Sequence, residues 1–84
     1  MKHRAHADFW AAYRRLQPEV QELADKCFEF LKADPRHPSL RLKKVGDYWS
    51  ARVGLHYRAV ALEVDDGLLW VWIGSHDDYE RFIG

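Results

Sequence analysis

Two arginines and two histidines in the second half of the chain carry side chains that can bind and cleave a phosphodiester. Arg52 and Arg58 lie in neighbouring segments joined by a short turn, and guanidinium groups from two adjacent strands can clamp one phosphate. His56 lies between them, and His76 follows a Gly-Ser pair. An imidazole can give or take a proton near neutral pH. We therefore expect a phosphate-binding arginine pair with His76 as its acid or base and His56 as a second candidate.

Arg58 and His76 also have purely structural explanations. Arg58 opens an apolar strand, where it could pair with Asp47, with Glu63 or with a backbone carbonyl at the end of the sheet. His76 could cap a helix or lie at the edge of the core. The two aspartates that follow it could orient its ring, or they could lie in the first turn of a helix and interact with the positive end of its dipole. The residue types alone leave these alternatives open.

The charges of the chain cancel overall but are segregated along the sequence. The formal net charge is zero. Residues 36–58 nevertheless hold six basic side chains against one acidic, and residues 59–84 hold six acidic against one basic. The basic side chains of the middle segment are those of Arg36, Arg41, Lys43, Lys44, Arg52 and Arg58. Such a segment could bind a phosphate backbone. The alternative interpretation is a solvated strand face whose charges prevent aggregation.

Hydrophobic periodicity predicts two helices at the start of the chain. Apolar side chains spaced at i, i+4 and i+7 predict a short helix over residues 9–16, capped by Asp8. A longer apolar repeat predicts a helix over residues 18–32, which an Asp-Pro pair then ends. The few residues between them make the pair a helical hairpin.

Alternating apolar and polar residues, broken by Gly-Asp and Asp-Asp-Gly turns, predict strands in the rest of the chain. We expect strands over residues 40–43, 48–53, 57–64 and 68–73, a helical turn or two over 76–83, and an optional short strand over 2–6. Trp49, Trp70 and Trp72 should lie in the core. The fold class is α+β: an N-terminal helical hairpin packed on one face of an antiparallel β-meander sheet, with a short C-terminal helix. The opposite face of the sheet should be free for function.

Composition limits the class of protein. Residues 1–84 suffice for a single small domain with an aromatic-rich core. The one cysteine fits a reducing cytoplasm, and no segment resembles a secretory signal or a membrane span. No His or Cys spacing indicates a metal site, and no P-loop or serine-hydrolase motif occurs. We expect neither a metal nor another cofactor.

Three strings resemble the RelE/ParE superfamily of bacterial toxin–antitoxin toxins. They are Trp49-Ser-Ala-Arg-Val-Gly54, Tyr57-Arg58-Ala-Val and Trp72-Ile-Gly-Ser-His76-Asp-Asp-Tyr79. The resemblance covers nearly the whole chain, including the helical hairpin and the C-terminal helix. For RelE-type members it implies a ribosome-dependent endoribonuclease, or mRNA interferase, that cuts messenger RNA in the ribosomal A site and inhibits translation.

The resemblance implies roles for individual residues. The Tyr-Arg strand motif of the family falls on Arg58, and the arginine before Val-Gly falls on Arg52; both would hold the scissile phosphate. The Gly-Ser/Thr-His ending is similar to the YafQ-like branch, in which the corresponding histidine is catalytic, and it falls on His76. That branch places another histidine and an aspartate where this chain has Arg52 and His56, so the general base stays open.

Further residues would bind the RNA around the cleavage site. Arg41 belongs to the basic strand face, and Lys43 and Lys44 match basic strand residues of the family loosely. Tyr79 lies near an aromatic position that some family members use to stack on a base. These four residues are the expected RNA-binding set.

Two targets fit the resemblance. The basic segment and His76 favour the ribosome and its mRNA, whereas the neutral net charge favours a ParE-like poison that binds DNA gyrase without enzymatic activity. A third alternative is an interaction module that does not stop growth. All of these interpretations imply a cognate antitoxin, acidic in character, that covers the basic face.

Overall fold

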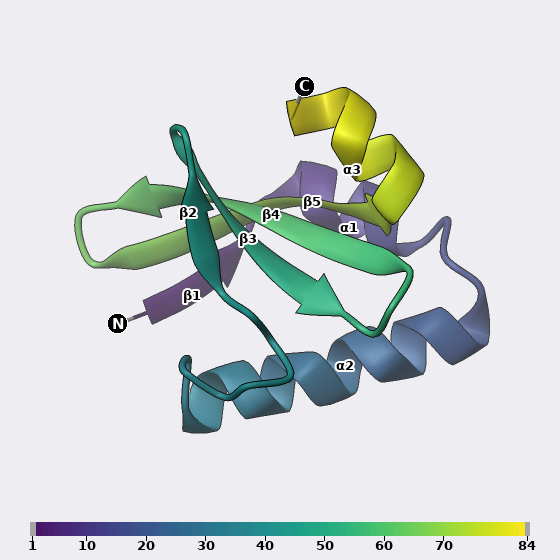
Figure 1. Ribbon diagram of the computed structural model, residues 1–84, viewed down its shortest axis with the longest axis horizontal. Coiled ribbons are helices and arrows are strands. Elements are labelled where there is room, and N and C mark those ends of the chain that lie inside the picture. Colours follow the sequence, from purple (N-terminus) through teal and green to yellow (C-terminus); the bar gives the residue numbers. More distant parts are fainter. Residues whose placement is uncertain (1, 84) are drawn as a thin grey trace.

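The computed structural model describes residues 2–83 as a five-stranded sheet with three helices (Figure 1). The elements in chain order are β1 (Lys2–Ala5), α1 (Ala7–Tyr13), α2 (Pro18–Ala33), β2 (Lys43–Val45), β3 (Tyr48–Val53), β4 (Tyr57–Val64), β5 (Gly67–Ser75) and α3 (His76–Ile83). The strand order across the sheet is β1-β5-β4-β3-β2. Strands β2 to β5 form the expected antiparallel meander, which confirms the α+β class. One correction is needed, because β1 pairs with β5 in parallel.

The first helix begins earlier and ends earlier than its apolar spacing predicts. His6, not Asp8, is the N-cap: its backbone is extended, and its Nδ1 accepts a hydrogen bond from the Asp8 backbone N–H at 3.0 Å. Asp8 instead lies in the first turn, where a carboxylate favours the positive end of the helix. The second helix matches its prediction to within one residue and buries a stripe of small and apolar side chains.

The prediction of a strand over residues 40–43 is wrong. The backbone of Arg41 has a φ of +44°, which is left-handed and interrupts an extended chain. Leu40 turns into the core with 1% of its surface exposed, and its carbonyl accepts a hydrogen bond from the Arg52 N–H at 2.6 Å. As a result β2 begins only at Lys43. The predicted bounds of β3 and β4 are confirmed, and β5 is longer than expected.

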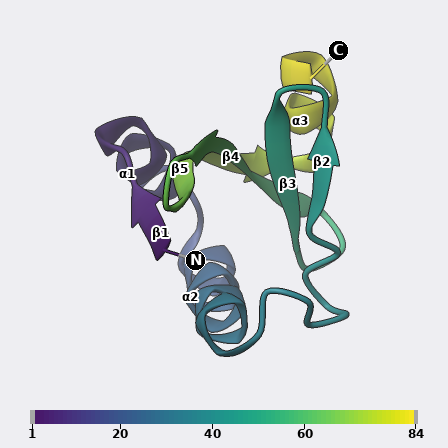
Figure 2. The same ribbon diagram turned by 90° about the vertical axis from the view of Figure 1, so that its left-hand side faces the viewer.

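The main core lies between α2 and one face of the sheet (Figure 2). Its buried side chains are those of Ala24, Cys27, Leu31, Leu40, Ala51, Val53, Ala59, Ala61, Leu68, Trp70 and Ile73. The first helix packs against β5, beside the parallel strand β1. At the start of β5, a side chain on Gly67 would collide with the backbone of Lys2, so the close approach of β1 requires glycine there.

The other face of the sheet is only partly free, which corrects the expectation of an open functional face. The third helix lies across it, on the side opposite α2, and contacts β4 and β5 (Figures 1 and 2). Phe82 stacks on Trp72 with ring centroids 5.4 Å apart and meets Tyr48 edge to face. Val60 is fully buried on this face. A small second apolar cluster therefore covers part of this face.

A β-bulge explains why the tryptophans do not share one environment. Ala61 pairs with Trp70 and Val60 pairs with Trp72, so β5 contains one extra residue at this point. An extra residue turns the side chains that follow it onto the opposite face. Trp70 therefore lies in the main core, Trp49 packs against its edge, and Trp72 faces α3. The prediction that all three lie in one core is wrong for Trp72.

Candidate functional site

Arg52 and Arg58 face each other directly across β3 and β4. Residues opposite each other in an antiparallel pair project from the same face of the sheet, with Cβ atoms about 5 Å apart. Arg58 Nη1 donates hydrogen bonds to the carbonyls of Tyr57 at 2.7 Å and Leu55 at 3.4 Å. Of the structural explanations for Arg58, the structure shows the bond to backbone carbonyls. These bonds use only one of its three guanidinium nitrogens, and neither Nη2 nor Nε has a protein hydrogen-bond partner within residues 2–83.

No carboxylate neutralises this pair. Within residues 2–83, neither Arg52 nor Arg58 has an acidic side chain within 4.0 Å, whereas Arg4, Lys32 and Arg81 all do. The Nε atom of Arg52 is buried without a hydrogen-bond partner. Buried polar groups are usually paired, and the exceptions commonly indicate a missing ligand or a functional role. The pair has the donors and the charge to hold an anion.

The electrostatic environment of Arg58 agrees with this geometry. Burial lowers the pKa of its guanidinium, and the positive charges of Arg52 and Arg41 lower it further. Tyr79 and Glu80 act in the opposite direction. An arginine stays protonated despite such a shift, so three positive charges remain close together. A phosphate bound among them would relieve their mutual repulsion.

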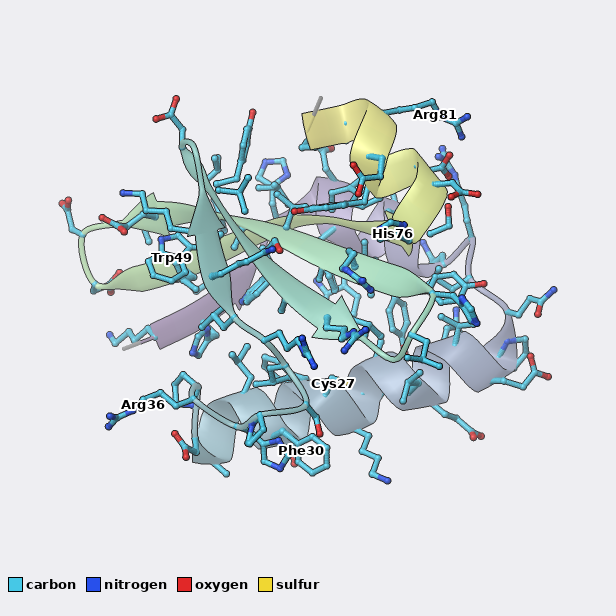
Figure 3. All side chains as sticks on the ribbon, in the orientation of Figure 1. Cys27, Phe30, Arg36, Trp49, His76 and Arg81 are labelled. Atoms are coloured by element: carbon cyan, nitrogen blue, oxygen red, sulfur yellow. The ribbon has the colours of Figure 1, made fainter. Side chains whose placement is uncertain are left out.

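His76 is the first residue of α3, at the base of that helix (Figure 3). Its backbone N–H donates to the His56 carbonyl at 2.7 Å, which ties α3 to the turn between β3 and β4. Ser75 accepts a hydrogen bond from the Asp78 N–H at 3.2 Å, so Ser75 rather than His76 supplies the side-chain cap of the helix. The structural explanation of His76 as a helix cap is therefore wrong.

Arg58 and the two histidines line one open pocket of about 300 Å³. Its lining residues are Leu55, His56, Tyr57, Arg58, Ser75, His76 and Asp77. Arg52 lies directly across the strand pair from Arg58. Three of the four residues that the sequence singles out for catalysis therefore line this pocket, and Arg52 lies on the neighbouring strand outside its lining.

The four expected RNA-binding residues are not all in the same place. Lys43 pairs with Ser50, two residues from Arg52, and so projects from the same face. Lys44 pairs with Trp49 and projects from the opposite face. Tyr79 is buried, with 8% of its surface exposed, so a base could stack on it only if α3 moved. Arg41 lies within electrostatic reach of Arg58.

Glu80 is a site residue that the sequence analysis missed. Its Oε1 lies 3.1 Å from Nε2 of His76, one helical turn away. Of the two aspartates expected to orient the ring, Asp78 pairs with Arg81 instead, and that pair lowers the pKa of the Asp78 carboxyl. The i, i+4 spacing of a histidine and a glutamate on a predicted helix was the available signal.

A second, apolar pocket of about 280 Å³ lies on the other side of the sheet, among β1, α1 and α2. Phe9, Trp10, Tyr13 and Phe28 contribute aromatic rings to its lining. Trp10 and Phe28 are also large apolar side chains with substantial exposure. Its lining also includes four polar residues: His3, Arg4, Asp25 and Arg52.

Two further properties concern residues 2–83. No group of three or more His, Cys, Asp or Glu side chains in this range is arranged to hold a metal ion. None of the described helices is long and apolar enough to cross a membrane.

Comparison with known proteins identifies the family. A family model described as a ParE-like toxin domain matches residues 18–81. No curated protein sequence matches the chain significantly. Among solved structures, the RelB-RelE antitoxin-toxin complex from Methanococcus jannaschii contains a similar chain, with a TM-score of 0.74 and 13% identity over 96% of this chain and 99% of that one.

Two solved toxins share the fold at comparable similarity. A YoeB/ParE toxin from Agrobacterium tumefaciens has a TM-score of 0.67 and 19% identity over 90% of this chain and 99% of that one. The isolated E. coli RelE toxin has a TM-score of 0.62 and 17% identity over 96% of this chain and 93% of that one. With the family match over most of its length, this chain belongs to the ParE-like toxin domain family of the RelE/ParE superfamily.

Proposed function

We propose that this protein is the toxin of a type II toxin–antitoxin system and acts in the cytoplasm as a ribosome-dependent mRNA endonuclease. The observation that carries the proposal is the Arg52–Arg58 pair, which faces one side of the sheet with no acidic partner within 4.0 Å in the described chain. Two facing guanidinium groups with no carboxylate in direct contact suit a phosphodiester. His56 and His76 line the pocket that contains Arg58.

The chemistry follows from these side chains. The ribose 2′-oxygen attacks the phosphorus, a 2′,3′-cyclic phosphate forms, and the bond from phosphorus to the 5′-oxygen breaks. One histidine takes the 2′-hydroxyl proton and the other gives a proton to the departing 5′-oxygen. Arg52 and Arg58 bind the scissile phosphate and stabilise the charge that develops on it. Glu80 Oε1, 3.1 Å from Nε2 of His76, can orient that ring.

Primer extension on ribosome-bound messenger RNA tests the proposal. The wild type should cut the message in the A site, and His76→Ala should cut it at least about 100-fold more slowly, because an acid–base group contributes on that order. His37→Ala, in a loop remote from the pocket, is the matched control and should cut at the wild-type rate. Equal cleavage by wild type and His76→Ala would remove His76 from the mechanism.

A gyrase poison is the second candidate, favoured by the zero net charge of the chain and by the ParE-like description of its family. A surface without a large positive charge is less suited to the ribosome. A gyrase cleavage-complex assay separates the two targets. Stabilised DNA breaks without any cleavage of messenger RNA would contradict the first proposal and support this one.

We further propose an acidic antitoxin as the partner of the basic face. The similar Methanococcus jannaschii toxin is part of an antitoxin-toxin complex. Binding to this face should weaken with added salt and with Arg52→Glu, because both reduce charge complementarity. If the cognate antitoxin binds equally well at high salt and to Arg52→Glu, the interface lies elsewhere on the toxin. The apolar pocket beside Trp10 would then be the next surface to test.

A further inference from the structure

Gly74 lies near the end of β5, at a position where the sheet has no room for a side chain. Its φ is outside the left-handed region, so the backbone alone would accept any residue. A Cβ atom placed on it would nevertheless lie 2.7 Å from Cη2 of Trp72, well inside the usual packing distance of about 3.5–4.0 Å between carbon atoms. The benzene part of the Trp72 indole therefore occupies the space that a side chain at Gly74 would need.

The same indole is the ring on which α3 rests. Phe82, in the last turn of α3, stacks on Trp72 with ring centroids 5.4 Å apart and ring planes 14° from parallel. Tyr48 meets Phe82 edge to face. The position of the Trp72 indole beside Gly74 therefore determines where the last turn of α3 packs on the sheet.

The first turn of the same helix belongs to the candidate site. His76 is the first residue of α3, and it lines the pocket together with Arg58. Gly74 lies directly opposite Arg58 in the pairing of β4 with β5, and His76 follows it two residues later. A helix of eight residues therefore connects the ring of Phe82 at one end with His76 at the other.

Stability alone explains little of this arrangement. Phe82 keeps 45% of its surface exposed, so its stacking on Trp72 buries only part of the ring. The gain from apolar burial follows the buried area and is correspondingly small. What the contact does fix is the position of α3. A reacting group needs such support, because it must be held within about 0.5 Å of its productive geometry.

We propose that Gly74 is a positioning residue for His76: it leaves room for the Trp72 indole, which holds α3 so that the imidazole lies in the pocket. An acid or base must come within hydrogen-bond reach of the proton that it transfers. A displacement of about 1 Å can lower the rate on the order of 100-fold. This inference rests on the proposed function and adds to it a residue that does not itself touch the substrate.

The NMR signals of the histidine rings test the positioning without any assay of cleavage. Gly74→Ala should displace the Trp72 indole and shift the Cε1–H signal of His76, whereas the signal of His37, in the loop after α2, should not move. Trp72→Phe provides a smaller ring that leaves room for the methyl group and can still stack on Phe82. In this background Gly74→Ala should shift the His76 signal much less.

Two results of this experiment would overturn the proposal. One is an unshifted His76 signal in Gly74→Ala, and the other is an equal shift in the wild-type and Trp72→Phe backgrounds. If Gly74→Ala does not fold, the double variant Gly74→Ala/Trp72→Phe must fold, because the clash is then removed. A double variant that also fails to fold would contradict the proposal equally.

The rate of cleavage tests the consequence for the reaction. Gly74→Ala should lower kcat on ribosome-bound messenger RNA about tenfold and leave KM within about twofold, because the substrate still binds while His76 is misplaced. In the Trp72→Phe background the same substitution should cost less than about twofold. An unchanged kcat in Gly74→Ala, or an equal loss in both backgrounds, would overturn the proposal.

Gly46→Ala, in the turn between β2 and β3, is the matched control. A methyl group there would meet no atom within 4 Å, but the φ of +61° makes alanine strained. It should therefore lower the Tm without lowering kcat or moving the His76 signal. A loss of kcat in Gly46→Ala as large as in Gly74→Ala would show that reduced stability alone explains the effect and would overturn the proposal.

The two measurements also separate this inference from the proposed function. If the wild type does not cut messenger RNA, but the His76 signal shifts in Gly74→Ala and recovers with Trp72→Phe, the nuclease proposal fails and the positioning stands. If the wild type and Gly74→Ala cut at the same rate and the His76 signal does not move, the nuclease proposal stands and the positioning is contradicted.

Discussion

The two faces of the sheet differ in how completely their side chains find packing or charge partners within the chain. The face toward α2 is apolar, and its strand residues Ala51, Val53 and Ala59 are buried against that helix. The face toward α3 is divided. One part is a small aromatic cluster around Phe82, and another part carries Arg52 and Arg58, which have no carboxylate within 4.0 Å in the described chain.

This difference indicates which face of the sheet stabilises the fold and which face is available to bind a ligand. The α2 face supplies the apolar burial on which a chain of this size depends. The basic part of the α3 face adds charge repulsion between Arg52 and Arg58 and an unpaired buried Nε atom of Arg52. A protein tolerates such features where they serve a ligand. Mutations on the two faces should therefore change different properties.

The largest effect on stability is expected on the α2 face. Leu31, with 4% of its surface exposed, packs in the main core. Leu31→Ala should reduce the free energy of unfolding by about 2–5 kcal/mol through lost burial and a cavity. Urea denaturation measures this, with the exposed Leu55→Ala as the control, expected to change it by less than about 0.5 kcal/mol. Similar losses for both variants would contradict the assignment of the core to this face.

For the arginine pair, we expect a large loss of activity and little change in stability. Arg58→Gln should slow messenger RNA cleavage about 100-fold or more, because the transition state loses a charged donor. It should leave the free energy of unfolding within about 0.5 kcal/mol, since it also removes repulsion with Arg52. Arg15→Gln, on the loop after α1, is the control and should change neither property. A large loss of stability in Arg58→Gln would make this arginine a structural residue.

The aromatic cluster on the α3 face should give an intermediate effect. Phe82→Ala removes the ring that stacks on Trp72, at a cost of about 1–2 kcal/mol. Hydrogen exchange of the α3 amides should become faster, and exchange in α2 should not change. Phe28→Ala, on α2, removes a ring of similar exposure and is the matched control. If α3 exchanges equally fast in wild type and Phe82→Ala, the cluster does not hold the helix.

The smallest effect concerns the pH dependence of stability. Burial lowers the pKa of His3 below its ordinary value of 6.5. The unfolded chain then binds the proton more readily than the folded one, so the contribution of His3 is complete above about pH 6.5 and is lost as the pH falls through the lower folded value. His3→Gln can keep an acceptor for the Trp70 indole N–H. Its Tm should fall less than that of the wild type between pH 7 and pH 5, and parallel decreases would contradict this account.

Local sequence patterns predict most of this fold. The long helix over Pro18–Ala33 and the strands Tyr48–Val53 and Tyr57–Val64 follow from periodicity because each buries one continuous face. The left-handed backbone at Arg41 has no local signal, since it depends on the contact of Leu40 with β3. The bulge that separates Trp70 from Trp72 likewise depends on pairing with β4.

The site is predictable to a similar degree. The facing positions of Arg52 and Arg58 follow from a short turn between two strands. The separation of Lys43 from Lys44 follows from strand alternation, which the sequence already contained. The burial of Tyr79 could not be predicted, because it depends on how α3 packs across the sheet.

A double-mutant cycle on the two arginines tests the central claim most directly. Single-turnover cleavage of ribosome-bound messenger RNA is measured for the wild type, Arg52→Gln, Arg58→Gln and the double variant. If both side chains bind one phosphate, the double variant should be little slower than the slower single variant, because the second substitution removes an interaction already lost. A shared phosphate site would be contradicted if the rate loss of the double variant equals the product of the two single losses. It would also be contradicted if the single variants cleave at the wild-type rate.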